Sequence, residues 1–334
     1  MGMTVPATDL TAHPWFFCGI GGSGMLPLAL ILRGHGAEIA GSDRSRDQGR
    51  AVEKFAWLER QGIILFPQDG SGVTSPSQTL VVSAAIEDNV PEVVRAATLG
   101  WARIPRAQLL ARLFNAAPNG IAVGGTSGKS TVTGMLGWIF AAAGRDPTIM
   151  NGAVMKNFVA PQIPFAAARV GKGPDFISEV DESDGSIALY RPAVAVLNNV
   201  SLDHKSLEEL RSLFGDFLAA SETAVLNLDD GESAALISRA HRLLTFGISR
   251  PDADIHAVQA SVRAGRNGIA AEIVDARDQS RHALSLAIPG EHNLMNALAA
   301  IAAASAAGVP VADAVAALAR FTGCLLYTSD AADE

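Results

Sequence analysis

The sequence has few cysteines, no long apolar run and no excess of basic residues, and each absence excludes a class of protein. Cysteine occurs only at Cys18 and Cys324, which is too few for a disulfide framework or a structural zinc site. No apolar run approaches the ~18 residues that a membrane-spanning helix needs. Residues 1–13 lack the basic segment and apolar core of a secretory signal, so we expect a cytoplasmic protein.

The charge balance argues against a nucleic-acid partner, because the net charge is −8 and no basic face stands out. It leaves room for anionic small-molecule substrates, which need only local positive groups. A hydrophobic content of 49% and a charged content of 18% are typical of a globular chain with real cores. A length of 334 residues suggests two or three domains, and we find no internal repeat.

Strand and helix signals alternate along the chain and predict an α/β fold with parallel sheets. Residues 14–118 are expected to form a Rossmann-like domain, in which a strand at Trp15–Cys18 leads through a glycine turn into a helix at Met25–Gly34. Residues 119–323 are expected to form a second α/β domain. Its predicted elements are strands at Gly120–Val123, Asp175–Glu179, Val194–Asn198 and Thr223–Asn227, a β-rich stretch at Asp254–Ala287 and a helix at Ala297–Ala307.

The stretch Gly124-Gly125-Thr126-Ser127-Gly128-Lys129-Ser130-Thr131 lies between a predicted buried strand and a predicted helix. That context is typical of a phosphate-binding loop, in which backbone N–H groups and a helix N-terminus surround an anion. Lys129 would reach the β- and γ-phosphates of a nucleotide, and the Ser130 hydroxyl would bind Mg²⁺. The spacing is one residue shorter than the common pattern, and an ordinary glycine-rich turn is the alternative.

A second glycine turn, Gly19-x-Gly21-x-x-Gly24, is followed by Asp43 about 20 residues on. Taken alone this pattern predicts NAD binding, but any ligand with a diphosphate can use the same turn. A purely structural turn is the third reading.

Polar residues follow two later strands. The block Glu179-Val180-Asp181-Glu182-Ser183-Asp184 has the carboxylates that Mg²⁺ prefers, although a solvated acidic loop is the alternative. His204 follows the next strand and could bind a metal, orient a phosphate or be structural. Asn293 and Asn296 open a later helix, where asparagine could read a nucleobase edge or cap the helix.

Together these blocks resemble the Mur ligase family, the ATP-dependent amide-forming enzymes of peptidoglycan synthesis. The resemblance runs from about Trp15 to Gly323 and is closest to the branch that adds L-alanine to UDP-N-acetylmuramate. It implies a P-loop NTPase-like central domain that uses ATP and Mg²⁺, and an N-terminal domain that binds a UDP-sugar. The UDP-sugar residues implied are Gly19, Gly21, Gly22, Ser23, Gly24, Met25, Asp43, Ser83, Ala84 and Ala85.

The resemblance also implies a reaction, in which ATP phosphorylates the muramate carboxylate and an amine attacks the acyl-phosphate. It assigns catalytic roles to Lys129, Glu179 and His204, with Ser130 and Glu179 on one Mg²⁺ and His204 on a second. The ATP-binding residues implied are Gly125, Thr126, Ser127, Gly128, Lys129, Ser130, Thr131, His292, Asn293 and Asn296.

The chain departs from the family in three places. Ser127 stands where the branch usually has histidine, and the insertion that usually follows His204 is shorter here. Residues 324–334 break the composition abruptly and look like translated adapter sequence, so we expect a non-native tail. The family's third domain is expected to be missing, which predicts that this 334-residue chain forms no amide alone.

Three other functions remain open from the sequence. A related ligase could act on a muropeptide or another amino acid, a module could bind UDP-sugar and ATP without ligation, and the first turn alone would fit an NAD-dependent oxidoreductase. The amino acid and the oligomeric state are not predicted.

Overall fold

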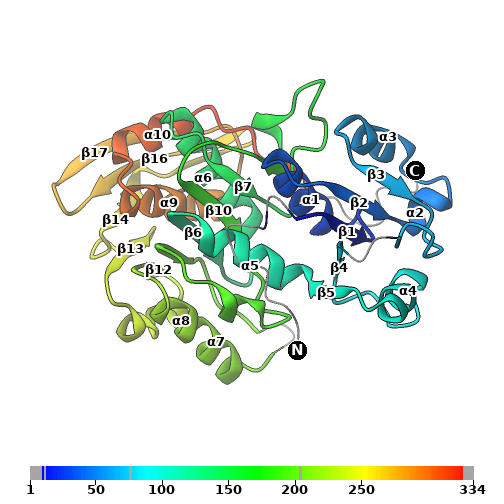
Figure 1. The fold of residues 1–334 in the computed structure, drawn as a ribbon. Coiled ribbons are helices and arrows are strands. Elements are labelled where there is room, and N and C mark those ends of the chain that lie inside the picture. The colour runs from blue at the N-terminus through cyan, green and yellow to red at the C-terminus, as the bar shows by residue number, and fades with distance from the viewer. Residues whose placement is uncertain (1–9, 11–12, 75–76, 203–204, 326–334) are drawn as a thin grey trace. The chain divides into compact units, whose positions relative to one another are not determined.

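The computed structural model describes residues 10, 13–74, 77–202 and 205–325 (Figure 1). Contacts divide the chain into two compact units. Unit 1 holds the residues up to Ala116 together with Gly152–Val154, and unit 2 holds Ala117–Asn151 and Met155–Leu325. Within the described residues, no helix is long and apolar enough to cross a membrane.

Unit 1 is built on a five-stranded sheet with the order β3-β2-β1-β4-β5, and every neighbouring pair is parallel. The strands are β1 (Trp15–Cys18), β2 (Ile39–Ser42), β3 (Ile64–Phe66), β4 (Thr79–Val82) and β5 (Ala102–Pro105). The helices are α1 (Met25–Gly34), α2 (Arg44–Asp47), α3 (Val52–Arg60), α4 (Pro91–Leu99) and α5 (Arg106–Ala116). The chain leaves β1 towards β2 and later returns to its other side at β4. The carboxyl ends of β1 and β4 therefore form the switch point where sheets of this kind bind ligands.

The strand predicted at Trp15–Cys18 and the helix predicted at Met25–Gly34 are confirmed. All four residues of β1 are buried, because a parallel sheet covered on both faces favours a continuous apolar run over an alternating one. β3 was not predicted although its residues are apolar; it is a short strand at the edge of the sheet, where Ile64 is exposed and Leu65 and Phe66 are half-buried.

Unit 2 is built on an eleven-stranded sheet with the order β15-β16-β14-β13-β12-β11-β6-β10-β7-β9, in which β17 pairs with β16. The central strands are β6 (Asn119–Gly124), β7 (Thr148–Met150), β10 (Asp175–Glu179), β11 (Val194–Leu197), β12 (Thr223–Asn227), β13 (Leu243–Gly247) and β14 (Ile255–Ala257), all parallel to their neighbours within this set. The antiparallel strands are β9 (Ala168–Arg169), β15 (Arg263–Gly265), β16 (Gly268–Asp275) and β17 (Ser280–Leu286). The predicted β-rich stretch Asp254–Ala287 is thus confirmed as mainly antiparallel.

The helices of unit 2 follow its strands. They are α6 (Lys129–Ala142), α7 (Leu207–Ala219), α8 (Gly231–Ala234), α9 (Glu291–Ala306) and α10 (Val311–Leu318). The remaining short elements are β8 (Val154–Met155), β18 (Cys324–Leu325) and the 3₁₀ turns η2 (Lys156–Phe158), η3 (Ser186–Leu189), η4 (Ile237–Arg239) and η5 (Gln259–Ser261). The predicted alanine-rich helix is α9, which begins six residues earlier than its alanine run.

Helices cover both faces of this sheet (Figure 1). Ile121 and Val123 of β6 point into one core with α6, α9 and α10. Gly124 points to the opposite face, where a Cβ would lie 3.3 Å from the Phe217 ring of α7. Because β6 is packed on both faces, the residues after Gly124 begin at a fixed position at the carboxyl edge of the sheet.

Candidate functional site

Residues 125–128 join the end of β6 to the start of α6, at the carboxyl edge of the sheet. Gly125 and Gly128 have positive φ angles of 126° and 84°, which L side chains rarely adopt. A Cβ on Gly125 would lie 3.0 Å from the carbonyl oxygen of Asn199, and one on Gly128 would lie 2.5 Å from Asn296 Oδ1. Both glycines are thus required by backbone conformation and by close packing, as a phosphate loop requires.

The first two residues of α6 each contact a carboxylate. Lys129 Nζ lies 3.0 Å from Glu182 Oε2 and donates a 2.7 Å hydrogen bond to the carbonyl of Gly125. The Ser130 hydroxyl donates to Glu179 Oε2 at 2.7 Å. Glu179 ends β10, which is the direct neighbour of β6, so the parallel register brings this carboxylate to the start of α6. The Glu182 side chain is only 8% exposed, which strengthens its attraction to the ammonium group.

Two asparagines after β11 hold the loop from the other side. The side-chain amides of Asn198 and Asn199 each donate to the carbonyl of Ser127 at 3.1 Å. Asn199 Oδ1 also accepts from the Ser127 N–H at 2.9 Å. The C=O of Ser127 and the N–H of Gly128 belong to one trans peptide and point to opposite sides. The hydrogen bonds to the Ser127 carbonyl therefore turn the N–H of Gly128 away from the asparagines.

Asn198 extends this network into α9. Its amide donates to Asn296 Oδ1 at 2.9 Å, and its backbone carbonyl accepts from Asn227 Nδ2 at 2.9 Å. Within the described part of the chain, Asn198 Oδ1 is buried and has no hydrogen-bond partner. Both neighbours of its amide nitrogen are acceptors, so the amide cannot flip to satisfy that oxygen.

The other residues predicted to bind the nucleotide differ in how far they are exposed to solvent. His292 is exposed at the start of α9, and Asn293 is half-buried with its amide donating to the carbonyl of Pro289 at 2.7 Å. Asn296 is 5% exposed and lies under Gly128. Thr126 exchanges hydrogen bonds with the backbone of Ser201, and Thr131 is half-buried in the first turn of α6.

The structure describes only two of the three residues predicted to bind metal. Ser130 and Glu179 are in contact, whereas His204 lies outside the described residues together with Asp203. The described residues contain no cluster of three His, Cys, Asp or Glu side chains able to hold a metal. The Ser130–Glu179 pair supplies two oxygen ligands, and Mg²⁺ at phosphate sites commonly takes one or two carboxylates with phosphate oxygens. This donor set therefore fits magnesium.

The first glycine turn follows β1 in unit 1. The N–H groups of Gly19 and Ile20 donate to the carbonyl of Ser42, and the N–H of Gly21 donates to Asp43 Oδ2 at 2.8 Å. Asp43 Oδ1 accepts from the N–H of Ser45, so this carboxylate caps α2 and stabilises the turn.

The remaining predicted UDP-sugar residues border the same edge of the unit 1 sheet. Gly22 and Ser23 are exposed and Gly24 is half-buried, while Met25 is buried as the first residue of α1. After β4, the half-buried Ser83 is followed by two exposed residues, Ala84 and Ala85. β4 pairs with β1, so the two loops lie beside each other at the switch point.

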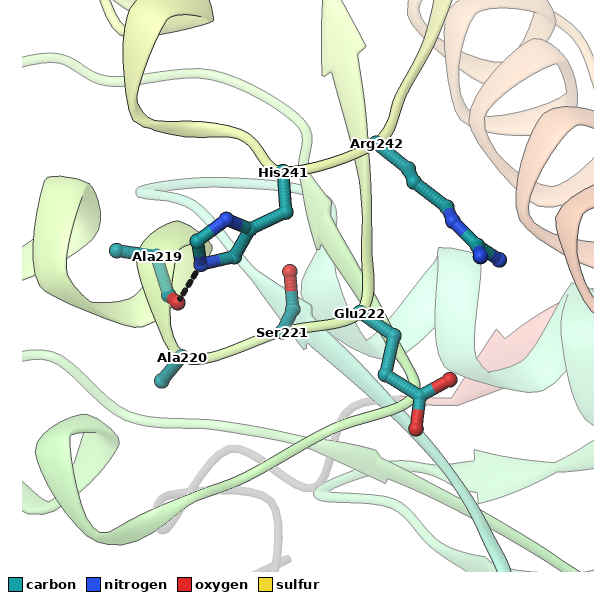
Figure 2. A pocket seen from close by; sticks show the side chains of 6 residues that line it. All are labelled: Ala219, Ala220, Ser221, Glu222, His241 and Arg242. Carbon is teal, nitrogen blue, oxygen red and sulfur yellow. Dashed lines mark hydrogen bonds between the residues drawn. The ribbon is translucent and has the colours of Figure 1, made fainter.

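A surface pocket of about 490 Å³ lies at the opposite edge of unit 2 (Figure 2). It is lined by Ala219, Ala220, Ser221, Glu222, His241 and Arg242, which precede β12 and β13. Figure 2 shows His241 beside the carbonyl of Ala219. The distance from His241 Nε2 to this carbonyl oxygen is 3.0 Å. Because β12 and β13 run parallel to β6, the pocket lies at the amino edge and the phosphate loop at the carboxyl edge.

Three functional candidates were not singled out from the sequence: Glu182, Asn198 and Asn199. Glu182 was one of several carboxylates in a short acidic block, and the two asparagines preceded a more conspicuous histidine. Their position directly after β10 and β11, at the edge that carries the phosphate loop, was the available signal.

Family models match most of the chain. One described as the Mur ligase middle domain matches residues 123–304, and one described as the Mur ligase family catalytic domain matches residues 16–117. The UDP-N-acetylmuramate–L-alanine ligase of Aquifex aeolicus is 34% identical over 301 residues, which is 88% of this chain and 63% of the relative. The enzyme of the same name from Nitrosomonas europaea is 35% identical over 317 residues, 92% of this chain and 64% of the relative. The chain thus spans less than two thirds of the length of these relatives.

Solved structures are similar over nearly the whole chain. The UDP-N-acetylmuramate–alanine ligase of Thermotoga maritima is 25% identical with a TM-score of 0.77, over 93% of this chain and 69% of that one. The UDP-N-acetylmuramate:L-alanyl-γ-D-glutamyl-meso-diaminopimelate ligase of Neisseria meningitides is 25% identical with a TM-score of 0.79, over 93% and 98%.

Proposed function

The chain belongs to the Mur ligase family, and from this we propose that it carries the UDP-sugar and ATP sites of a ligase that adds L-alanine to UDP-N-acetylmuramate. Family models match residues 16–117 and 123–304, and the two relatives reported above are named for that activity. An NAD-dependent oxidoreductase is disfavoured, because hydride transfer needs neither a phosphate loop nor carboxylates beside it.

The observation that carries the proposal is the pairing of Lys129 with Glu182 and of Ser130 with Glu179 at the start of α6. In a ligase of this kind, the γ-phosphoryl group of ATP passes to the substrate carboxylate. The amine then attacks the acyl-phosphate carbon, the amide C–N bond forms and phosphate leaves. Both reactants are anionic, so positive charge and N–H donors must be gathered where they meet.

The roles of individual residues follow from their placement. Lys129 would stabilise the negative charge on the transferred phosphoryl group, and the loop from Gly125 to Gly128 would surround the phosphates with N–H groups. Ser130 and Glu179 would hold one Mg²⁺, which when bound neutralises phosphate charge. We keep His204 as the proposed ligand of a second Mg²⁺, and His292, Asn293 and Asn296 as the residues that contact or position the adenine.

In unit 1, the turn Gly19–Met25 with Asp43 and the segment Ser83–Ala85 would bind the UDP-sugar. Asp43 would act by shaping the turn, since both of its oxygens accept backbone N–H groups. Cytoplasmic location and the absence of nucleic-acid and membrane partners stay predictions.

The amine substrate has one specific alternative. The fold is as similar to a ligase named for L-alanyl-γ-D-glutamyl-meso-diaminopimelate as to a ligase named for alanine. A muropeptide ligase would use the same ATP and UDP-sugar sites, so the experiment must include both amines.

The test separates binding from turnover. Isothermal titration of the 334-residue chain should show binding of MgATP and of UDP-N-acetylmuramate in separate titrations, and no binding of NADH. Amide formation is then assayed with L-alanine and with the tripeptide, and we expect no product with either amine from the 334-residue chain alone. Binding of NADH without binding of UDP-N-acetylmuramate would refute the ligase assignment.

A further inference from the structure

Arg106 lies against the glycine turn of unit 1. It is the first residue of α5 and directly follows β5, so it begins at the same carboxyl edge as the turn. A Cβ on Gly24 would lie 3.1 Å from Arg106 Nη1 and 3.2 Å from its Cδ and Cζ. A side chain on Gly24 would therefore press on this guanidinium, which packs directly on the turn.

Arg106 is partly buried and forms no hydrogen bond or ion pair with any residue that the structure describes. The nearby Arg103 behaves differently, because its guanidinium pairs with Asp88 at 2.7 Å. In a chain with a net charge of −8, carboxylates are plentiful, yet none lies on Arg106. This planar guanidinium has no acidic partner and lies beside a predicted phosphate-binding turn. It is therefore suited to bidentate hydrogen bonding with an anion.

A second cation lies on the other flank of the turn. Lys54 of α3 donates to the carbonyl of Gly21 at 3.4 Å. α3 follows β2 and α5 follows β5, so the two cations come from opposite sides of β1 in the sheet order. Asp43 Oδ2 accepts the N–H of Gly21 in the turn, and Asp43 Oδ1 accepts the N–H of Ser45 in α2.

We propose that Arg106 binds the diphosphate of the nucleotide-sugar at the turn Gly19–Gly24. The proposal rests on the proposed function, since it takes the ligand of unit 1 to be a uridine diphosphate compound. Arg106 supplies charge and paired N–H donors to phosphate oxygens, and it does not read the base. It thereby makes affinity depend on the number of phosphates.

The test measures the affinity of the full 334-residue chain for a series of ligands by isothermal titration. The ligands are uridine, UMP, UDP and UDP-N-acetylmuramate. The variants are Arg106→Gln, Arg106→Lys and the matched control Arg112→Gln on the same helix. We expect Arg106→Gln to weaken UDP binding by about 10- to 100-fold and uridine binding by less than about twofold. Arg106→Lys should recover part of the loss, and added salt should weaken UDP binding less in Arg106→Gln than in the wild type.

Two results would overturn the proposal while leaving the ligase assignment intact. One is an equal loss for uridine and UDP in Arg106→Gln, which would indicate a structural role. The other is an equal loss of UDP affinity in Arg112→Gln and Arg106→Gln, which would indicate a long-range charge effect. If the wild-type chain binds NADH and neither UDP nor UDP-N-acetylmuramate, the proposed function fails and this inference fails with it.

Discussion

At the residue scale, Lys129 is the group on which the proposed chemistry of unit 2 depends most directly. Its ammonium is held between Glu182 and the carbonyl of Gly125, so it is already oriented at the start of α6. Placing a cation there in advance avoids reorganisation when phosphate charge develops.

Lys129→Ala should weaken ATP binding by about 100-fold, because the charged hydrogen bonds to phosphate are lost. UDP-N-acetylmuramate binding should be unchanged, because its proposed site is in unit 1. Titration calorimetry with each ligand measures both effects. Removing Lys129 also leaves the poorly exposed Glu182 carboxylate without this partner, so Lys129→Ala with Glu182→Gln serves as the stability control. Unchanged ATP affinity in Lys129→Ala would place the phosphates elsewhere.

The two cysteines are unreactive by environment. Burial raises the pKa of the Cys18 thiol to about 12, and the nearby charge of Glu92 acts in the same direction. Burial also raises the pKa of the Cys324 thiol to about 12; its Sγ lies 3.6 Å from the carbonyl of Ser130. Both thiols therefore stay protonated near neutral pH, although one lies close to the proposed nucleotide site.

Alkylation by iodoacetamide should reflect these pKa values. A shift from 9.0 to about 12 lowers the thiolate fraction at pH 8 by about 1000-fold, so the folded chain should react that much more slowly than the unfolded one. The same shift predicts that stability is fully present below pH 9 and declines as the pH rises above it, because unfolding then releases protons. Rapid labelling of either cysteine in the folded chain at pH 8 would contradict this.

At the element scale, the asparagines after β11 connect the phosphate loop to α9. Asn198 contacts Ser127 of the loop and Asn296 of the helix, and Gly128 packs on both amides. A helix expected to reach the adenine is thereby coupled to the loop expected to hold the phosphates.

A double-mutant cycle on Asn198→Ala and Asn296→Ala tests this coupling. We expect each single change to weaken ADP binding and the pair to show a coupling energy of about 1 kcal/mol in urea unfolding, because the two amides share one hydrogen bond. The comparison variant is Asn227→Ala. The Asn227 side chain donates to the backbone carbonyl of Asn198 and not to its side chain. Purely additive effects would show that the two elements are independent.

The strands and helices differ in how well the sequence predicted them. β1, α1, β10 and β12 were predicted with their observed bounds, because each has buried apolar residues at its centre and is flanked by turn or polar residues. β3 and β5 were not, since β3 is a three-residue strand at the edge of its sheet and β5 (Ala-Arg-Ile-Pro) has no apolar run.

At the scale of the whole molecule, the chain contains two compact units with separate proposed ligands. The phosphate loop and its carboxylates belong to unit 2, and the glycine turn with Arg106 belongs to unit 1. Ligands that bind only the folded state of one unit should stabilise that unit selectively.

Differential scanning calorimetry should therefore resolve ligand-specific effects. MgATP at 100 times its Kd should stabilise unit 2 by about 2.7 kcal/mol, and UDP-N-acetylmuramate should stabilise unit 1 by a similar amount. At the same MgATP concentration, Lys129→Ala should lower this stabilisation to about 0.4 kcal/mol, while the UDP-N-acetylmuramate shift remains. A single transition that both ligands raise equally would show that the two units unfold as one.

By itself the sequence determined the α/β class, the strand–turn–helix context of the predicted phosphate loop from Gly124 to Thr131 and the glycine turn from Gly19 to Gly24. Those features are local, because a strand, a turn and a helix start are specified by neighbouring residues. Only the tertiary structure decided that Glu182 pairs with Lys129, that Asn296 lies beneath Gly128 and that Arg106 packs on Gly24. These contacts join residues far apart in the chain, and they depend on strand order and register, which no short motif contains.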